Sequence, residues 1–201
     1  MYGLPPSTII SRPLYKKAVF EKFNLKTAER DRFDADVSKM VLVAYVSSKK
    51  IPALGEGKDV VEFYVLQVLL KHRKYDNRNI LLLDKLIPQH IVYALQHESE
   101  TRFCVFHTRL LQSEWMRSED AIIMLKGLTF DDAWNNIVAS IGKLDATADE
   151  SIEKQILHRE ERDSLLQQIG ALEKRCRMEK QTRKKYELHQ QLIKLKEEIG
   201  L

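Results

Sequence analysis

The sequence lacks several patterns that accompany membrane insertion, secretion or nucleotide hydrolysis. None of its segments reaches the roughly 18 uninterrupted apolar residues of a membrane span. Its first six residues lack the charged start and apolar core of a signal peptide. Only seven of the 201 residues are glycine, and none belongs to a glycine-rich phosphate loop. We therefore expect a cytoplasmic protein that neither enters a membrane nor hydrolyses nucleotides.

Cysteines and histidines are also too few and too scattered to indicate a metal or catalytic centre. The two cysteines, Cys104 and Cys176, have no CxxC partner, and the six histidines form no HExxH or HxH motif. A nuclease would require clustered carboxylates and a lysine around a metal ion. Asp59, Glu62 and Lys71 lie in or beside one expected strand but do not share the required spacing on one strand face. The sequence thus predicts no metal, no cofactor and no catalytic residue.

Apolar and charged residues are both abundant. A hydrophobic content of 44% is ample for a packed core, and the 31% of charged residues exceeds that of an average domain. Such an excess is typical of a chain with a long exposed helical element. The 33 basic and 29 acidic residues give a net charge of +4, which is mild beside that of a dedicated nucleic-acid-binding protein. The whole-chain charge therefore does not decide between functions.

The first 145 residues alternate between helix and strand signals. Helical spacing or capping patterns predict helices at residues 13–23, 27–38, 80–87 and 129–142. Runs of β-branched, aromatic and other apolar residues predict strands at residues 41–46, 60–70, 91–95 and 102–108, with a short run at 121–125 as a further candidate. The run 60–70 is apolar enough for a central strand. We therefore predict an α+β domain over residues 1–145, with a mixed sheet of about four or five strands and flanking helices.

Residues 146–201 show helical signals only. Two seams have coiled-coil spacing: Leu165, Ile169, Leu172 and Cys176 in the first, and Leu188, Leu192, Leu195 and Ile199 in the second. The two seams do not share a heptad register, which favours a helical hairpin, although a stutter in one continuous coiled coil would give the same shift. We expect a protein partner, or a second copy of the chain, to bind through Leu165, Ile169, Leu172, Leu188, Leu192 and Leu195.

The break between the seams coincides with the densest positive charge. Basic residues before the break suit a helix C-terminus, but Arg183, Lys184 and Lys185 would open a helix, where acidic residues are preferred. This misfit favours an anionic partner, although a solvated turn alone would also be charged. A second basic cluster leaves the expected central strand and is followed by an aromatic residue, Tyr75, that would suit base stacking. The expected DNA- or RNA-binding residues are Arg175, Arg177, Lys180, Arg183, Lys184, Lys185, Lys71, Arg73 and Lys74.

Four segments carry a family resemblance: Leu4-Pro-Pro-Ser, Arg12-Pro-Leu-Tyr-Lys-Lys, Phe33-Asp-Ala-Asp-Val-Ser-Lys-Met and Glu179-Lys-Gln-Thr-Arg-Lys-Lys-Tyr-Glu-Leu. These segments resemble a bacterial family of unknown function, the domain of unknown function numbered four-three-nine-one. The resemblance extends over the whole length of the chain. The resemblance implies an accessory role beside DNA methyltransferases and helicases of restriction-like systems. It implies no catalytic residue.

Three functions follow from these patterns. The first is a non-catalytic accessory subunit of a prokaryotic defence or DNA-processing system, with a helicase or DNA methyltransferase as its protein partner. The second is a stand-alone nucleic-acid-binding module. The third, a small metal-dependent nuclease, is the weakest because its carboxylates lack a recognisable spacing. The sequence leaves open the identity of the partner, the choice between DNA and RNA, and the oligomeric state.

Overall fold

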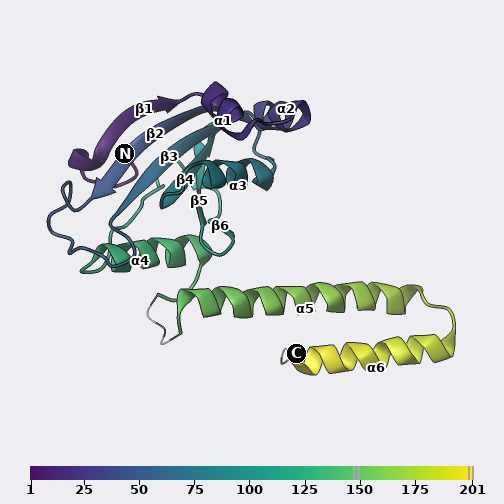
Figure 1. Cartoon of the computed structure of the whole chain (residues 1–201). Helices are drawn as coiled ribbons and strands as arrows, with labels where there is room; N and C mark the ends of the chain where they lie inside the picture. The colour runs from purple at the N-terminus through teal and green to yellow at the C-terminus, as the bar shows by residue number, and fades with distance from the viewer. Residues whose placement is uncertain (147, 149, 199, 201) are drawn as a thin grey trace. The chain divides into compact units, whose positions relative to one another are not determined.

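A mixed sheet of seven strands forms the centre of the first of two units in the chain (Figure 1). The computed structural model describes residues 1–146, 148, 150–198 and 200, and its two compact units are residues 1–147 and 148–201. The strands are β1 (Ile9–Leu14), β2 (Val37–Ser47), β3 (Glu62–Leu70), β4 (Ile91–His97), β5 (Glu100–Phe106), β6 (Leu110–Gln112) and β7 (Met116–Arg117). Strands β1 to β6 lie in chain order and β7 pairs with β5. Only the β3–β4 pair is parallel among these described pairings.

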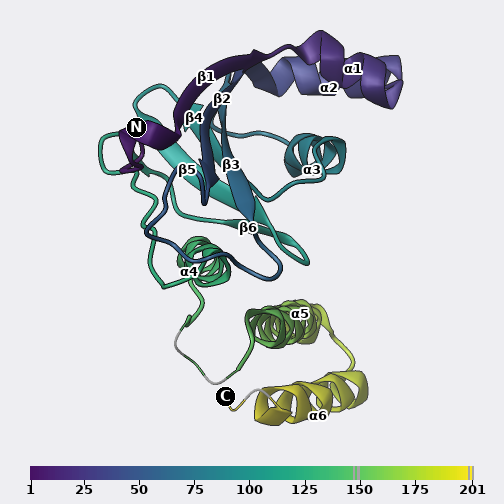
Figure 2. The same ribbon diagram turned by 60° about the vertical axis from the view of Figure 1, so that its left-hand side comes forward.

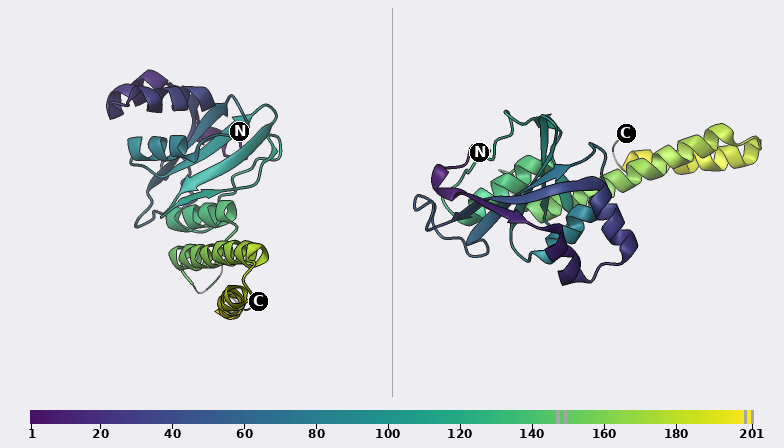
Figure 3. Two further views of the ribbon diagram at one scale, coloured as in Figure 1. Left: turned by 90° about the vertical axis from the view of Figure 1, so that its right-hand side faces the viewer. Right: turned by 90° about the horizontal axis from the view of Figure 1, so that it is seen from above.

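Helices cover both faces of this sheet. The first unit contains a short 3₁₀ turn (Pro6–Thr8) and the helices α1 (Lys16–Phe23), α2 (Thr27–Asp36), α3 (Asn77–Leu86) and α4 (Phe130–Gly142). Helix α3 is the crossover that the parallel β3–β4 pair requires, and it lies on the opposite face of the sheet from α4 (Figure 2). Helices α1 and α2 lie side by side (Figure 3). The fold is therefore a mixed α/β arrangement, as the sequence predicts.

Strand β3 is buried on both sides, which explains its nearly continuous apolar sequence. Its residues Leu66 and Val68 belong to the core under α1, α2 and α3, whereas Phe63 lies on the other face with its ring centroid 5.6 Å from that of Trp134 on α4. Helix α4 begins with the predicted capping box. The Thr129 hydroxyl accepts a hydrogen bond from the Asp132 N–H at 3.2 Å.

The sequence underestimates the number of strands. The prediction of four or five strands was wrong because β1, β6 and β7 were missed, and residues 121–125 form no strand. Pro13 was expected in the first turn of a helix but lies in β1, and α1 begins at Lys16. Proline fits there because β1 is an edge strand, which pairs on one side only. Strands β6 and β7 span three and two residues, too few to show a period of two.

Two antiparallel helices make up the second unit. Helix α5 (Ile152–Met178) and helix α6 (Thr182–Glu198) are joined by residues 179–181 (Figure 1). Ile169 and Leu192 are the buried side chains of the two seams, with exposed fractions of 5% and 8%. The Lys196 ammonium lies 2.7 Å from the Glu173 carboxylate and links the helices at their rim. The chain therefore reverses between the seams; Ile199 of the second seam lies outside the described residues.

No helix in the described part of the chain is both long enough and apolar enough to cross a membrane.

The two cysteines occupy contrasting environments, and this contrast is testable. Burial raises the pKa of the Cys104 thiol to about 12, so the reactive thiolate is scarce near neutral pH. Cys176, on α5, is only half-buried. We expect iodoacetamide to label Cys176 alone in the native protein and both cysteines in urea, as measured by peptide mass spectrometry. Rapid native labelling of Cys104 would contradict the burial of β5.

Candidate nucleic-acid interface

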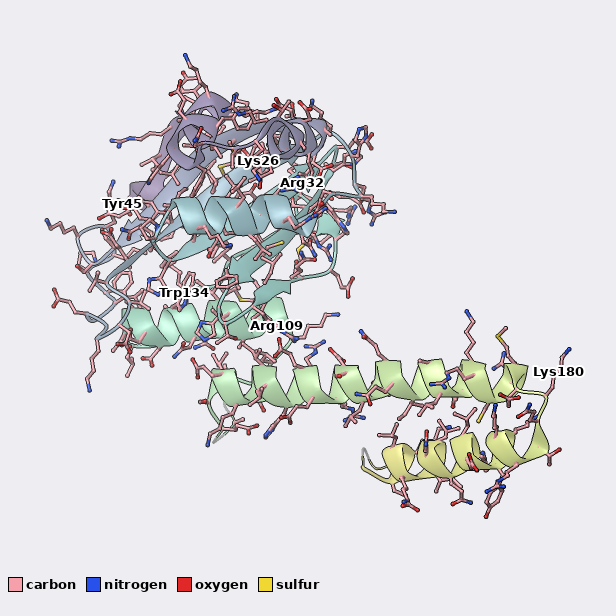
Figure 4. All side chains as sticks on the ribbon, turned by 45° about the vertical axis from the view of Figure 1, so that its right-hand side comes forward. Lys26, Arg32, Tyr45, Arg109, Trp134 and Lys180 are labelled. Atoms are coloured by element: carbon pink, nitrogen blue, oxygen red, sulfur yellow. The ribbon has the colours of Figure 1, made fainter. Side chains whose placement is uncertain are left out.

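The hairpin brings together the cations that flank its turn. We call residues 175–187 the basic tip: Arg175 and Arg177 lie in the last turn of α5, Lys180 lies in the connection (Figure 4), and three cations follow at the start of α6. The Cys176 Sγ lies 3.8 Å from the Lys185 backbone oxygen, so the two helix ends are in contact. Five cations from two helices and one from their connection therefore share one end of the hairpin.

The basic tip holds the entire charge excess of the chain. Six of the 33 basic residues and two of the 29 acidic residues fall within residues 175–187, which gives this segment a charge of +4. The other residues contain 27 basic and 27 acidic side chains and therefore balance. The net charge of the whole chain is mild, but the positive charge is concentrated at one end of one hairpin.

The acidic residues of the basic tip leave most of its cations uncompensated. Glu179 accepts a hydrogen bond from the Gln181 N–H at 2.8 Å, and this bond lowers the pKa of Glu179. Glu187 lies 3.4 Å from Arg183, but the Arg183 side chain is 94% exposed, so this ion pair contributes little to stability. Within the described residues, the other five cations have no acidic partner within 4.0 Å. Their charge faces solvent.

The arrangement of charge in α6 also opposes its helix dipole. The first turn of α6 contains no acidic residue, and its first residue, Thr182, is followed by Arg183, Lys184 and Lys185. Cations at a helix N-terminus are unfavourable by a few tenths of a kcal/mol each at an exposed position. Local helix stability therefore does not explain these cations, whereas binding of an anion would.

The seam residues that were expected to bind a partner lie along the interior of the hairpin. Ile169 and Leu192 are buried, and the other four are half-buried: Leu165, Leu172, Leu188 and Leu195. Two amphipathic helices of this kind stabilise each other by covering their apolar stripes. The packing of α5 on α6 thus gives these six side chains a structural role, and partner binding through them stays a prediction.

The second predicted basic cluster has internal partners. The Lys71 ammonium donates a hydrogen bond to the Asp34 backbone oxygen. Arg73 lies 3.2 Å from Glu100, and its guanidinium stands 5.6 Å from the centre of the Trp115 ring. Lys74 is exposed at the rim of an open hollow near α3. Two of these three side chains therefore have contacts within the first unit, which makes the basic tip the stronger candidate for an interface.

One polar cluster in the first unit was not expected from the sequence. The rings of Tyr45 (labelled in Figure 4) and Tyr64 stack with centroids 5.0 Å apart, and both hydroxyls donate to the Glu62 carboxylate. Glu62 and Tyr64 could be placed on one strand face from their spacing. The position of Tyr45 depends on an irregularity in the β2–β3 register between Leu42 and Ala44, which the sequence does not reveal.

This cluster also bears on the nuclease hypothesis. Glu62 begins β3, whereas Lys71 follows its last residue, so the strand separates them by roughly 30 Å. No group of three or more His, Cys, Asp or Glu side chains in the described residues has the geometry of a metal site. Asp59 and Glu62 line one open hollow, but the lysine considered with them, Lys71, lies at the far end of β3.

Glu62 should control the titration of both tyrosines. Burial, followed by the hydrogen bond to Glu62, raises the pKa of Tyr64 to about 12, and the Glu62 hydrogen bond is the main cause that raises the pKa of Tyr45. Because these pKa values are higher in the folded state, the associated stability is complete below about pH 10 and is lost as the pH rises toward 12. We expect Glu62→Gln to lower both pKa values, with the larger relative effect on Tyr45. Ultraviolet absorbance of phenolate against pH measures this, and an unchanged titration would contradict the cluster.

Comparison with known proteins identifies the family of the chain. Residues 2–199 match the model of one family, described as Domain of unknown function (DUF4391). No curated protein and no solved structure matches the chain. Because the match spans both units, the first unit and the hairpin both belong to the pattern of this family. The chain belongs to the family described as Domain of unknown function (DUF4391).

Proposed function

We propose that this chain is a non-catalytic accessory subunit of a prokaryotic defence or DNA-processing system, and that it binds nucleic acid through the basic tip. The concentration of the chain's whole charge excess on the exposed end of one hairpin supports this proposal. Nucleic acids are densely charged polyanions, and each Lys or Arg that contacts a phosphate releases condensed counterions. The basic tip offers up to six such contacts.

Binding to nucleic acid is directly measurable. Fluorescence anisotropy of a labelled oligonucleotide of about 20 nucleotides, longer than the roughly 4–16 that one single-strand-binding domain covers, reports the affinity of the full chain. We expect a Kd of roughly 10⁻⁶ to 10⁻⁴ M near physiological salt, as for sequence-independent binding. An absence of binding at low salt would refute this part of the proposal.

The accessory role requires a protein partner as well. The family resemblance supports a helicase or a DNA methyltransferase. Affinity purification of the tagged full chain from its native host, with and without nuclease treatment of the lysate, should recover such an enzyme in both preparations. Recovery of the chain alone would favour the alternative of a stand-alone nucleic-acid-binding module, since the basic tip supports both.

A further inference from the structure

An aromatic side chain stands exposed among the cations of the basic tip. Tyr186 is 65% exposed and lies one helical turn after Arg183. Across the connection, Met178 at the end of α5 is 71% exposed. Within the described residues, no hydrogen bond or ring contact holds the side chain of Tyr186. Two large apolar side chains are thus presented to solvent where the charge is densest.

Packing of the hairpin does not require the ring of Tyr186. The seam of α6 contains Leu188 and Leu192, and Leu192 is buried. Tyr186 precedes Leu188 by two residues, which places it about 200° away around the helix. The ring therefore points away from the seam, whereas Arg183 and Tyr186, three residues apart, are neighbours on one face. This face joins a cation and an aromatic ring outside the hairpin interior.

Such a face has a specific chemical use. An exposed aromatic ring stacks on the face of an unpaired base, while neighbouring cations contact the phosphates of the same strand. In a duplex the bases are stacked on each other, so a surface ring has no free base face to contact. The combination of Tyr186 with the basic tip therefore distinguishes single strands from duplexes.

We propose that the basic tip binds single-stranded nucleic acid, with Tyr186 stacked on an unpaired base and Arg183, Lys184 and Lys185 on the phosphates. This inference rests on the proposed function, because it names the class of nucleic acid that the basic tip binds. Stacking and phosphate contact are sequence-tolerant, since every base has a π face. DNA and RNA single strands share this chemistry.

The test uses the full chain and four proteins: the wild type, Tyr186→Ala, Tyr186→Phe, and the triple variant Arg183→Glu, Lys184→Glu, Lys185→Glu. The probes are labelled oligothymidylate, oligouridylate and a DNA duplex of equal length. We expect the wild type to bind the single strands more tightly than the duplex. Tyr186→Ala should weaken single-strand binding roughly ten-fold and leave duplex binding unchanged, whereas Tyr186→Phe retains the stacking ring and should bind as the wild type does.

The outcomes separate the two proposals. If Tyr186→Ala binds single strands as the wild type does while the triple variant does not, stacking is overturned and the basic tip stands. Equal losses of single-strand and duplex binding in Tyr186→Ala would also overturn the preference for single strands. If the triple variant binds like the wild type, the proposed function itself fails. The oligothymidylate and oligouridylate results show whether the strand is DNA or RNA.

Discussion

Reversing the three charges that open α6, with Arg183→Glu, Lys184→Glu and Lys185→Glu, should weaken nucleic-acid binding about a hundred-fold or more near 0.1 M salt. Each phosphate contact to a single strand contributes a salt exponent of about 0.7, which corresponds to roughly five-fold in affinity at this salt concentration. The loss of three contacts multiplies to about a hundred-fold, and the new negative charges add repulsion. All three side chains are exposed, so the hairpin should fold normally. Anisotropy titrations measure the loss, and circular dichroism checks the fold.

A matched control separates a local site from a general effect of charge. Lys154, Arg162 and Lys194 are also exposed cations of the second unit, and their reversal changes the net charge by the same amount. Lys194 lies about 14 Å along α6 from Lys185, and the other two lie on the first half of α5. At a Debye length of about 10 Å their influence at the basic tip is largely screened. An equal loss of binding in both triple variants would show that only net charge matters.

Placing a carboxylate in the seam should open the hairpin. The side chain of Ile169 on α5 is only 5% exposed. Ile169→Asp therefore removes a core side chain and places a charge where water is scarce. Replacement of a buried Ile by a small residue alone costs about 2–5 kcal/mol. Most of the stability of a protein helix comes from packing of its apolar face, and the 17-residue α6 has little length beyond the roughly 12–15 residues below which isolated helices are marginal in water. We expect α6 to lose its amide hydrogen-exchange protection and the basic tip to lose affinity.

Leu166→Asp provides the control for this change. Leu166 lies on the same helix, less than one turn from Ile169, but is 41% exposed. A carboxylate there stays hydrated, so the exchange protection of α6 should remain close to that of the wild type. If α6 kept its protection in Ile169→Asp as well, the seam would not be what holds the two helices together.

The elements that the sequence predicts best are those whose signal is local. Strand β3 is apolar at nearly every position because both of its faces are covered. Helix α4 is indicated by the capping residues Thr129 and Asp132 and by apolar residues at helical spacing, among them the buried Trp134. The register break between the seams correctly indicates a reversal near residue 180. In each case a few neighbouring residues contain the information.

The elements that were missed depend on partners far away in the chain. Strand β1 exists because it pairs with β2, and its Pro13 resembles a helix start when read alone. Strands β6 and β7 are short segments that pair with β5. Likewise, the contact of Tyr45 with Glu62 follows from strand register and not from composition.

The candidate site also depends partly on local sequence signals and partly on contacts between distant segments. The charges of the basic tip are visible in the sequence because they are consecutive, whereas their gathering from two helices requires the observed reversal. The outward direction of Tyr186 follows only once the seam of α6 is known to face α5. The internal partners of Lys71 and Arg73, which weaken the second cluster, come from distant segments at Asp34 and Glu100.

The salt dependence of binding tests the basic tip most directly. For the wild type with oligothymidylate, six phosphate contacts predict a slope of log Kobs against log salt of about −4, and the triple variant at residues 183–185 should flatten it to about −2 or less steep. The control triple variant should keep the wild-type slope. Equal slopes for the wild type and the variant at residues 183–185 would contradict the assignment of nucleic-acid binding to this end of the hairpin.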